Sequence, residues 1–430
     1  MKKLNIKNDL KKIIYNSFWL FSEKLFKIFL GFTVSIWVAK YLGPTHFGEL
    51  TYAITVIGFF QVLSKFGLDT IIVRELSNKK FTEGVILGTA FRVRLIAGGL
   101  SCFVCLLTAY ISGQHNYLIH MIILSPILLS QSLDIIDLKF QSNSKSKYTV
   151  RIKYVTYILS NSLRVMAILL EFDVSIFLAI FMLELLLVSI LLRRQYVKNK
   201  VSDIIWSFDQ QLFYILIKES WPYMVSGISI LLYMRIDQVF IKGYLEPYEL
   251  GIYAVVLPLS TFWQFVPVTL VTSLAPYIAR KKDESEYEYY KSLYNSFRFF
   301  NLFSLSLCVS VTFLGNHIMG FIYGNQYPGA GEILTYHIWT NYFICFGMVQ
   351  SLWILNEKKS KLNLYKTIAG ALVCLLGNYF VIDRFGLIGV AWVAVVSQFS
   401  ATLISDFFLA RKMFFYQLRS VLFLKFKLLQ

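Results

Sequence analysis

Charged side chains lie inside several long apolar segments of this 430-residue chain, and they are the residues that could do chemistry. The first segment carries Glu23, Lys24 and Lys27, which share one polar stripe of a helix turning about 100° per residue. The seventh carries Arg235 and Asp237, which are two residues apart and therefore point to different faces. Each such charge costs ~2.5–3.5 kcal/mol at the centre of a membrane helix, so its presence indicates a functional site.

Other charges are expected inside later segments. Arg164 falls in the fifth, Glu184 near the middle of the sixth, and Asp406 in the inner part of the twelfth. Basic residues on the leading helix of each half predict a central cavity suited to an anion, such as a pyrophosphate or an acidic sugar. The predicted substrate-binding cations are Lys24, Lys27, Arg235 and Arg164. The acids that could couple transport to H⁺ or Na⁺ are Glu23, Glu184, Asp237 and Asp406.

A simpler interpretation of the first segment stays open. Glu23 and Lys27 have the i,i+4 spacing of a self-neutralising ion pair, and Lys24 could extend its ammonium to the membrane interface. For Arg235 and Asp237, a polar cavity lining is favoured over a private ion pair, because the two side chains diverge.

Enzyme signatures are absent from the sequence. It has no P-loop, no H-E-x-x-H and no G-x-S-x-G, and its five histidines are scattered without ligand spacing. The predicted outer loops run to about ten residues, well short of a catalytic domain. We therefore expect neither cofactor nor metal, and no covalent chemistry.

The elements that position these charges are membrane helices. Hydrophobic residues make up 57% of the chain and charged residues 16%, whereas soluble domains carry about a quarter charged residues. Apolar runs recur near the ~20 residues that cross a bilayer as helix. We predict an all-α polytopic membrane protein with about twelve transmembrane helices, at residues 15–39, 49–68, 86–111, 117–137, 149–171, 174–193, 221–242, 251–275, 299–322, 333–355, 362–382 and 387–410.

Basic residues alternate between the loops. The net charge of +17 would suggest nucleic acid for a soluble protein, but in a membrane protein the position of the charge matters more. Outer loops hold only Lys40, Lys242 and Arg384. The inner segments hold most of the 42 basic residues, from the N-terminal lysines to a last inner loop containing Lys366. This pattern predicts a membrane protein with both termini in the cytoplasm, an even number of spans and no nucleic-acid partner.

Two halves are visible in the sequence. Tyr41–Gly48 follows the first predicted span and Tyr244–Gly251 follows the seventh, and both read Y-L-x-P-x-x-(F/L)-G. Six spans per half give a parallel repeat about an axis along the membrane normal. The predicted organisation is a six-helix lobe, an amphipathic cytoplasmic linker with the composition of a surface helix, a second six-helix lobe and a basic cytoplasmic tail, at residues 1–193, 194–220, 221–410 and 411–430.

The chain resembles the polysaccharide transport family, the O-antigen repeat-unit flippases of the multidrug/oligosaccharidyl-lipid/polysaccharide exporter superfamily. The segments that carry the resemblance, in chain order, are 41–48, 66–76, 235–238, 323–327 and 385–389. The resemblance implies two six-helix lobes that form a V around a cationic central cavity. It also implies a substrate made of a polyprenyl pyrophosphate that carries an oligosaccharide.

The predicted function is a flippase, not an enzyme. It would move undecaprenyl-pyrophosphate-linked repeat units of O-antigen or capsule, as in lipopolysaccharide synthesis, across the inner membrane by alternating access. Its expected partners are that lipid-linked oligosaccharide, membrane lipids and a glycan polymerase machinery. The alternatives are a cation-coupled drug exporter or another lipid-linked precursor exporter of the same superfamily, a membrane glycan polymerase, and a non-transporting scaffold.

Overall fold

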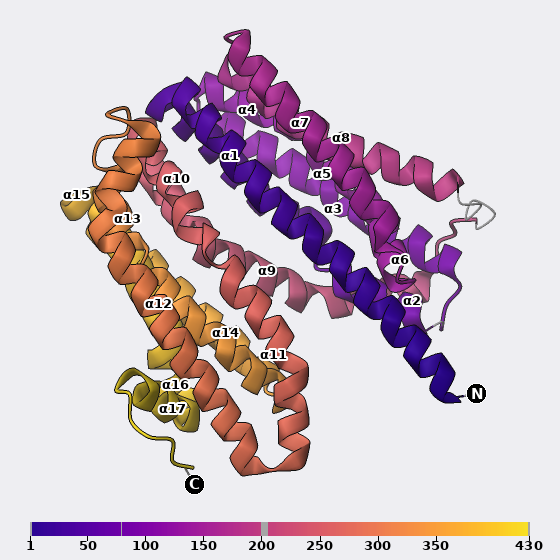
Figure 1. Cartoon of the computed structure of the whole chain (residues 1–430). Coiled ribbons are helices and arrows are strands. Elements are labelled where there is room, and N and C mark those ends of the chain that lie inside the picture. The colour runs from indigo at the N-terminus through magenta and orange to yellow at the C-terminus, as the bar shows by residue number, and fades with distance from the viewer. Residues whose placement is uncertain (1, 79, 199–204, 429–430) are drawn as a thin grey trace. The chain divides into compact units, whose positions relative to one another are not determined.

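The computed structural model describes the backbone of residues 2–78, 80–198 and 205–428, with side chains from Phe18 onward other than that of Ser360. All regular secondary structure in these residues is helical and no strand occurs among them, as Figure 1 shows. The all-α prediction is therefore confirmed. Several residues of the predicted charge pattern lie outside the described part, namely Lys79, Lys200 and the side chains of Lys2, Lys3, Lys7, Lys11 and Lys12.

The chain forms two compact units. The first comprises Met1–Leu42 and Glu49–Ile228, and the second Gly43–Gly48 and Ser229–Gln430. In chain order the helices are α1 (Lys2–Lys65), α2 (Asp69–Asn78), α3 (Glu83–Ile111), α4 (His115–Leu124), α5 (Pro126–Ser130), a 3₁₀ helix (Gln131–Asp134), α6 (Ile135–Ser142), α7 (Ser146–Leu169), α8 (Val174–Lys198), α9 (Gln210–Tyr244), α10 (Pro247–Phe262), α11 (Phe265–Glu284), α12 (Glu286–Tyr323), α13 (Ala330–His337), α14 (Thr340–Asn356), α15 (Ser360–Phe399), a π-helical segment (Ser400–Ile404), α16 (Ser405–Leu409) and α17 (Arg411–Val421).

Helices occupy all of the predicted spans. Nine helical stretches of the described residues are long and apolar enough to cross a membrane. Two of them, Phe18–Asn78 and Lys361–Leu409, each contain a glycine with non-helical backbone angles, Gly43 and Gly386, which separates two predicted spans. Helix α7 is also long enough but less apolar. The number of membrane crossings stays a prediction.

The linker predicted at residues 194–220 is helical at both ends, in α8 up to Lys198 and in α9 from Gln210. Residues 205–209 between them have no helical structure, residues 199–204 lie outside the described part, and a surface helix there stays a prediction. The backbone N–H of Ser207 donates to Gly84 O at 3.3 Å, and the indole of Trp206 donates to the Tyr196 hydroxyl at 3.0 Å. The carboxylate of Asp209 then caps α9 by accepting from the N–H of Leu212 at 2.6 Å. The linker aromatics are thus used to pack within the first unit.

The compact units also divide the chain inside α9, between Ile228 and Ser229. The predicted lobe boundaries at the linker stay a prediction. The first part of the predicted basic tail, α17, packs into the second unit (Figure 1), where Met413, Tyr416, Gln417 and Ser420 are buried.

The two copies of the repeated turn touch each other within the second unit. Pro44 restarts the helix after the break at Gly43, and Pro247 begins α10, the helix position that suits proline best. A Cβ at Gly48 would overlap the carbonyl oxygen of Pro247, and a Cβ at Gly251 would overlap the carbonyl oxygen of Pro44. The contact is reciprocal between equivalent residues of the repeat, and it requires glycine at both positions.

Alanine at either crossing glycine should destabilise the protein. We expect Gly48→Ala and Gly251→Ala each to lower the Tm in detergent and the amount of folded protein, because overpacking typically costs ~1–3 kcal/mol and these contacts are with backbone. Gly58→Ala is the matched control in α1, because a Cβ there meets open space. It should be neutral or stabilising by up to about 1 kcal/mol. Equal Tm values for Gly48→Ala and Gly58→Ala would contradict the crossing.

Candidate functional site

In the first unit, Glu23 and Lys27 of the polar stripe on α1 face α7. The carboxylate of Glu23 is buried and lies 3.0 Å from the Lys27 ammonium and 3.6 Å from that of Lys153. Lys153 also lies 2.8 Å from Asp137 of α6. The hydroxyl of Tyr157 donates to Lys27 O at 3.1 Å, which fixes α7 along α1 (Figure 1). The i,i+4 pair considered from the sequence therefore exists, as one end of a longer chain of charges.

A second buried ion pair joins α7 to α8. The guanidinium of Arg164 lies 3.1 Å from the carboxylate of Glu184, which also accepts a hydrogen bond from Ser160 at 2.6 Å. Arg164 donates further to the side-chain oxygen of Asn161 at 3.2 Å. Arg164 and Glu184 therefore neutralise each other. Arg164 is predicted from the sequence as a substrate-binding cation and Glu184 as a coupling acid.

Residues of the sequence motif at 66–76 form ion pairs as well. Asp69 pairs with Arg94, whose side chain is fully buried. Arg74 pairs with Glu75 at 2.8 Å and also with Glu219 near the start of α9. These motif residues join helices within the first unit.

Two of the predicted substrate-binding cations have no such partner. Lys24 is exposed in the first unit and Arg235 is exposed in the second, and neither forms an ion pair among the described residues. Arg235 and Asp237 diverge as expected from their spacing, because Asp237 is buried while Arg235 is not.

The second unit contains a cavity of about 420 Å³. Helix α9 contributes Tyr233 and Asp237, α13 contributes His337, and α15 contributes Lys366 and Ser397. The carboxylate of Asp237 accepts from the Tyr253 hydroxyl at 2.6 Å and from the N–H of Gln238 at 2.8 Å. A cavity that combines apolar walls with a few convergent polar groups is the usual form of a ligand site.

Asp406, the fourth predicted coupling acid, is completely buried beside this cavity. It lies 2.9 Å from the ammonium of Lys366 and accepts from the amides of Gln350 and Gln417, at 2.5 and 2.8 Å. From the sequence, Lys366 is expected in a cytoplasmic loop, so its pair with Asp406 is not predicted. Its position four residues inside the predicted span 362–382 was the available signal.

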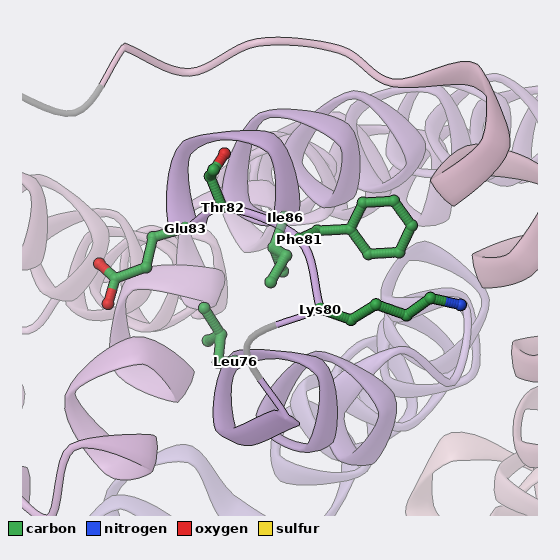
Figure 2. Close-up of a pocket in the computed structure, with 6 residues that line it drawn as sticks. All are labelled: Leu76, Lys80, Phe81, Thr82, Glu83 and Ile86. Carbon is green, nitrogen blue, oxygen red and sulfur yellow. The ribbon is translucent and has the colours of Figure 1, made fainter.

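A smaller pocket lies at the turn between α2 and α3 in the first unit. Its volume is about 300 Å³, and Leu76, Phe81 and Ile86 form its apolar lining. Figure 2 shows Lys80 and Glu83 extending in opposite directions, so their charges do not converge on one ligand. Glu83 also pairs with Lys139. Within the described residues, no cluster of three or more His, Cys, Asp or Glu side chains could hold a metal ion.

Comparison with family models decides the classification. The model described as "Polysaccharide biosynthesis protein" matches residues 13–282, more than half of the chain. The chain belongs to this family. A second model, MatE, matches residues 222–380 of the same protein. The family resemblance inferred from the motifs is therefore confirmed. No match was found among curated proteins.

Solved structures show the same fold for this member of the polysaccharide biosynthesis family. The lipid II flippase MurJ in an inward closed conformation has a TM-score of 0.74 at 16% identity, covering 94% of this chain and 91% of its own. An inward-facing multidrug resistance MATE family transporter of the MOP superfamily has 0.66 at 13% identity, covering 92% and 94%. A MATE transporter of Vibrio cholerae has 0.59 at 13% identity, covering 95% and 97%.

The chain thus belongs to a polysaccharide biosynthesis family and has the fold of the MurJ and MATE proteins. Nine helical stretches of its described residues are long and apolar enough to cross a membrane, as expected for a multi-pass membrane protein. The roles of the individual charged residues stay predictions. The structure brings Glu23 to Lys27, Arg164 to Glu184 and Asp406 to Lys366 as ion pairs, and it leaves Lys24 and Arg235 without one.

The charge chain of the first unit predicts unequal effects for its two lysines. In Lys27→Ala, Glu23 keeps Lys153, so the loss should be that of a partly exposed pair, ~0.2–1 kcal/mol. In Lys153→Ala, Asp137 loses its ion-pair partner and Glu23 keeps only Lys27, so the loss should be larger, ~1–3 kcal/mol. Thermal unfolding in detergent measures both. Adding Asp137→Asn to Lys153→Ala should recover part of the loss, and a Lys27→Ala variant less stable than Lys153→Ala would refute the shared chain.

Proposed function

We propose that this protein is a flippase for polyprenyl-pyrophosphate-linked oligosaccharide repeat units of O-antigen or capsule type. The head group enters from the cytoplasm, the lipid tail stays in the bilayer, and alternating access exposes the sugar on the other side. The family match supports a role in polysaccharide biosynthesis. The fold is shared with a protein named for flipping lipid II, and this supports a lipid-linked substrate.

The observation that carries the proposal is the imbalance between paired and unpaired charge. Three of the four candidate acids are taken by internal cations: Glu23 by Lys27 and Lys153, Glu184 by Arg164, and Asp406 by Lys366. Lys24 and Arg235, on the leading helix of each half, are exposed without an ion pair among the described residues. The two side chains that remain without an ion pair are cations, so they favour an anionic ligand such as a pyrophosphate.

The same imbalance argues against export of cationic drugs. A site for organic cations would need carboxylates that are free to pair with the ligand, and Asp237 is the one candidate acid that forms no ion pair among the described residues. Lys24 in the first unit and Arg235 in the second are therefore the cations that we propose to attract anionic groups of the substrate. Lys27 and Arg164 hold the helices that present the site, since each is already paired.

The proposed setting is the bacterial inner membrane, where the resemblance to O-antigen repeat-unit flippases would place the chain. The alternation of Lys and Arg between loops supports both termini in the cytoplasm. A glycan polymerase machinery on the outer side would consume the flipped repeat unit.

Removal of either unpaired cation should impair transport without loss of protein. We expect Lys24→Ala and Arg235→Ala each to lower flipping of a polyprenyl-pyrophosphate-linked oligosaccharide in proteoliposomes at least about tenfold, the effect of losing a charge-assisted hydrogen bond. Arg235→Lys should retain partial activity if charge alone suffices, and little if bidentate contacts are needed. Surface glycan and membrane abundance should be measured for the same variants in cells.

Lys242→Ala is the matched control, because it removes a basic residue from the same helix, α9, at its predicted outer end. It should transport normally. Full activity in Lys24→Ala and Arg235→Ala alike would end the cationic-site assignment. Normal surface polymer in a deletion strain that has no second flippase would refute the proposed function.

Asp237 is the acid that we propose for coupling to H⁺ or Na⁺. It is buried on the cavity wall and is held by neutral donors only, so a bound cation or proton would neutralise it. Cys374 and Ser397 line the same cavity. The side-chain oxygen of Asn378, one turn along α15 from Cys374, is buried without a hydrogen-bond partner in the described residues.

Asp237→Asn should therefore uncouple transport while the shape of the side chain is kept. In proteoliposomes, a pH or Na⁺ gradient should accelerate flipping by the native protein and leave the variant at its gradient-free rate. Asp383→Asn changes an exposed acid outside the cavity and is the control. An unchanged response of Asp237→Asn to both gradients would exclude this carboxylate as the coupling site.

A further inference from the structure

Lys366 is the one Lys or Arg among the described residues that line the cavity of the second unit. Its side chain lies on the first turns of α15 and is only 6% exposed. A lysine at this depth must have a counter-ion, and Asp406, which is 0% exposed, provides it at 2.9 Å. The cavity wall thus contains a cation, Lys366, that is neutralised by a carboxylate outside the cavity lining, that of Asp406.

Asp406 does not depend on Lys366 alone. The amide of Gln350 on α14 donates to one carboxylate oxygen at 2.5 Å, and the amide of Gln417 on α17 donates to the other at 2.8 Å. The amide oxygen of Gln350 also accepts from Lys366. If the ammonium turned toward the cavity, the carboxylate would lose its cation but keep two hydrogen bonds, which lower the free-energy cost of leaving its charge buried.

The backbone before Asp406 is unusual in the same place. Residues Ser400–Ile404 form a π-helical segment, and the hydroxyl of Ser405 donates to Ser400 O at 2.8 Å. An extra residue in a helical turn is a common device at functional sites, because the register can shift locally without unfolding the helix. Asp406 follows two residues after this segment, on α16.

We propose that Lys366 binds the anionic phosphate group of the substrate by exchanging its counter-ion. The incoming phosphate takes the place of Asp406 on the Lys366 ammonium, and Asp406 relaxes onto Gln350 and Gln417. The inference rests on the proposed function, since it names a further binding residue for the same anionic substrate. It also connects the cavity to the C-terminal helix α17, whose Gln417 holds the displaced carboxylate.

Counter-ion exchange makes a prediction that a purely structural ion pair does not. Geranylgeranyl pyrophosphate is the probe, and its dissociation constant is measured with the purified full-length protein in detergent. Lys366→Gln should weaken binding at least about tenfold, because a charge-assisted hydrogen bond is lost. Asp406→Asn should tighten binding, because the competing carboxylate is removed. The opposite signs of the two changes are the diagnostic result.

Lys412→Gln is the matched control. Lys412 also belongs to the second unit and pairs with Glu286 at 3.2 Å, but it does not line the cavity. Its partial burial works against the charged form, yet the hydrogen bond to Glu286 and the nearby Tyr290 and Tyr416 outweigh this and raise its pKa. It is therefore a charged, paired lysine whose removal should leave probe binding unchanged.

The outcomes separate this inference from the proposed function. If the native protein does not bind the probe, the anionic substrate itself is refuted. If the native protein binds and Lys366→Gln binds equally well, or if Asp406→Asn weakens binding, counter-ion exchange is refuted and the pair is structural. Where a single variant does not fold, the double variant Lys366→Gln/Asp406→Asn replaces the buried charges with amides. It should bind as weakly as Lys366→Gln, and native-like binding by it would overturn the proposal.

Discussion

A charge inside a membrane protein must be neutralised by the protein itself, and much of this structure follows from that constraint. In the first unit it produces a chain from Lys27 through Glu23 and Lys153 to Asp137, which ties α1 to α7 and α6. In the same unit, Arg94 is fully buried because Asp69 of a neighbouring helix pairs with it. Charged side chains that form no ion pair within the fold are therefore candidates for binding a ligand, because packing of the helices does not explain their presence.

The second unit uses the same rule in a different way. Its buried lysine lies on the wall of a cavity, and the counter-ion behind it is shared with two amides from other helices. The two amides would lower the free-energy cost to Asp406 if its cation turned to an anion in the cavity, as we propose. The distinction between a structural pair and a ligand-responsive one therefore depends on what lies next to the cation, and not on the pair itself.

Close backbone packing complements the electrostatics. Membrane helices lack a strong hydrophobic drive to associate, so small residues that allow close approach matter more than in water. The reciprocal contacts of Gly48 with Pro247 and of Gly251 with Pro44 apply this rule at equivalent points of the two halves. In the alternating-access cycle that we propose, some contacts must hold while others open, and a backbone crossing without side chains between its helices is suited to hold.

The sequence by itself determined the helical membrane class, the positions of the helices, the family and the repeat. These follow from local properties: apolar length, the alternation of Lys and Arg, and the proline and glycine of each turn. The sequence also indicated the Glu23–Lys27 ion pair as one possibility, because residues four apart on one helix lie next to each other.

Only the tertiary structure decided which charges are satisfied. Lys153 reaches Glu23 from α7, Arg164 reaches Glu184 from α8, and Lys366 meets Asp406 from a separate helical segment. It also showed that residues 205–209 of the linker contact α3 through Ser207 and that α17 is packed into the second unit. The physical reason is common to all of these. Ion pairs and packing contacts form between helices that are distant in sequence. The spacing of residues along one helix does not predict which side chains a neighbouring helix places next to them.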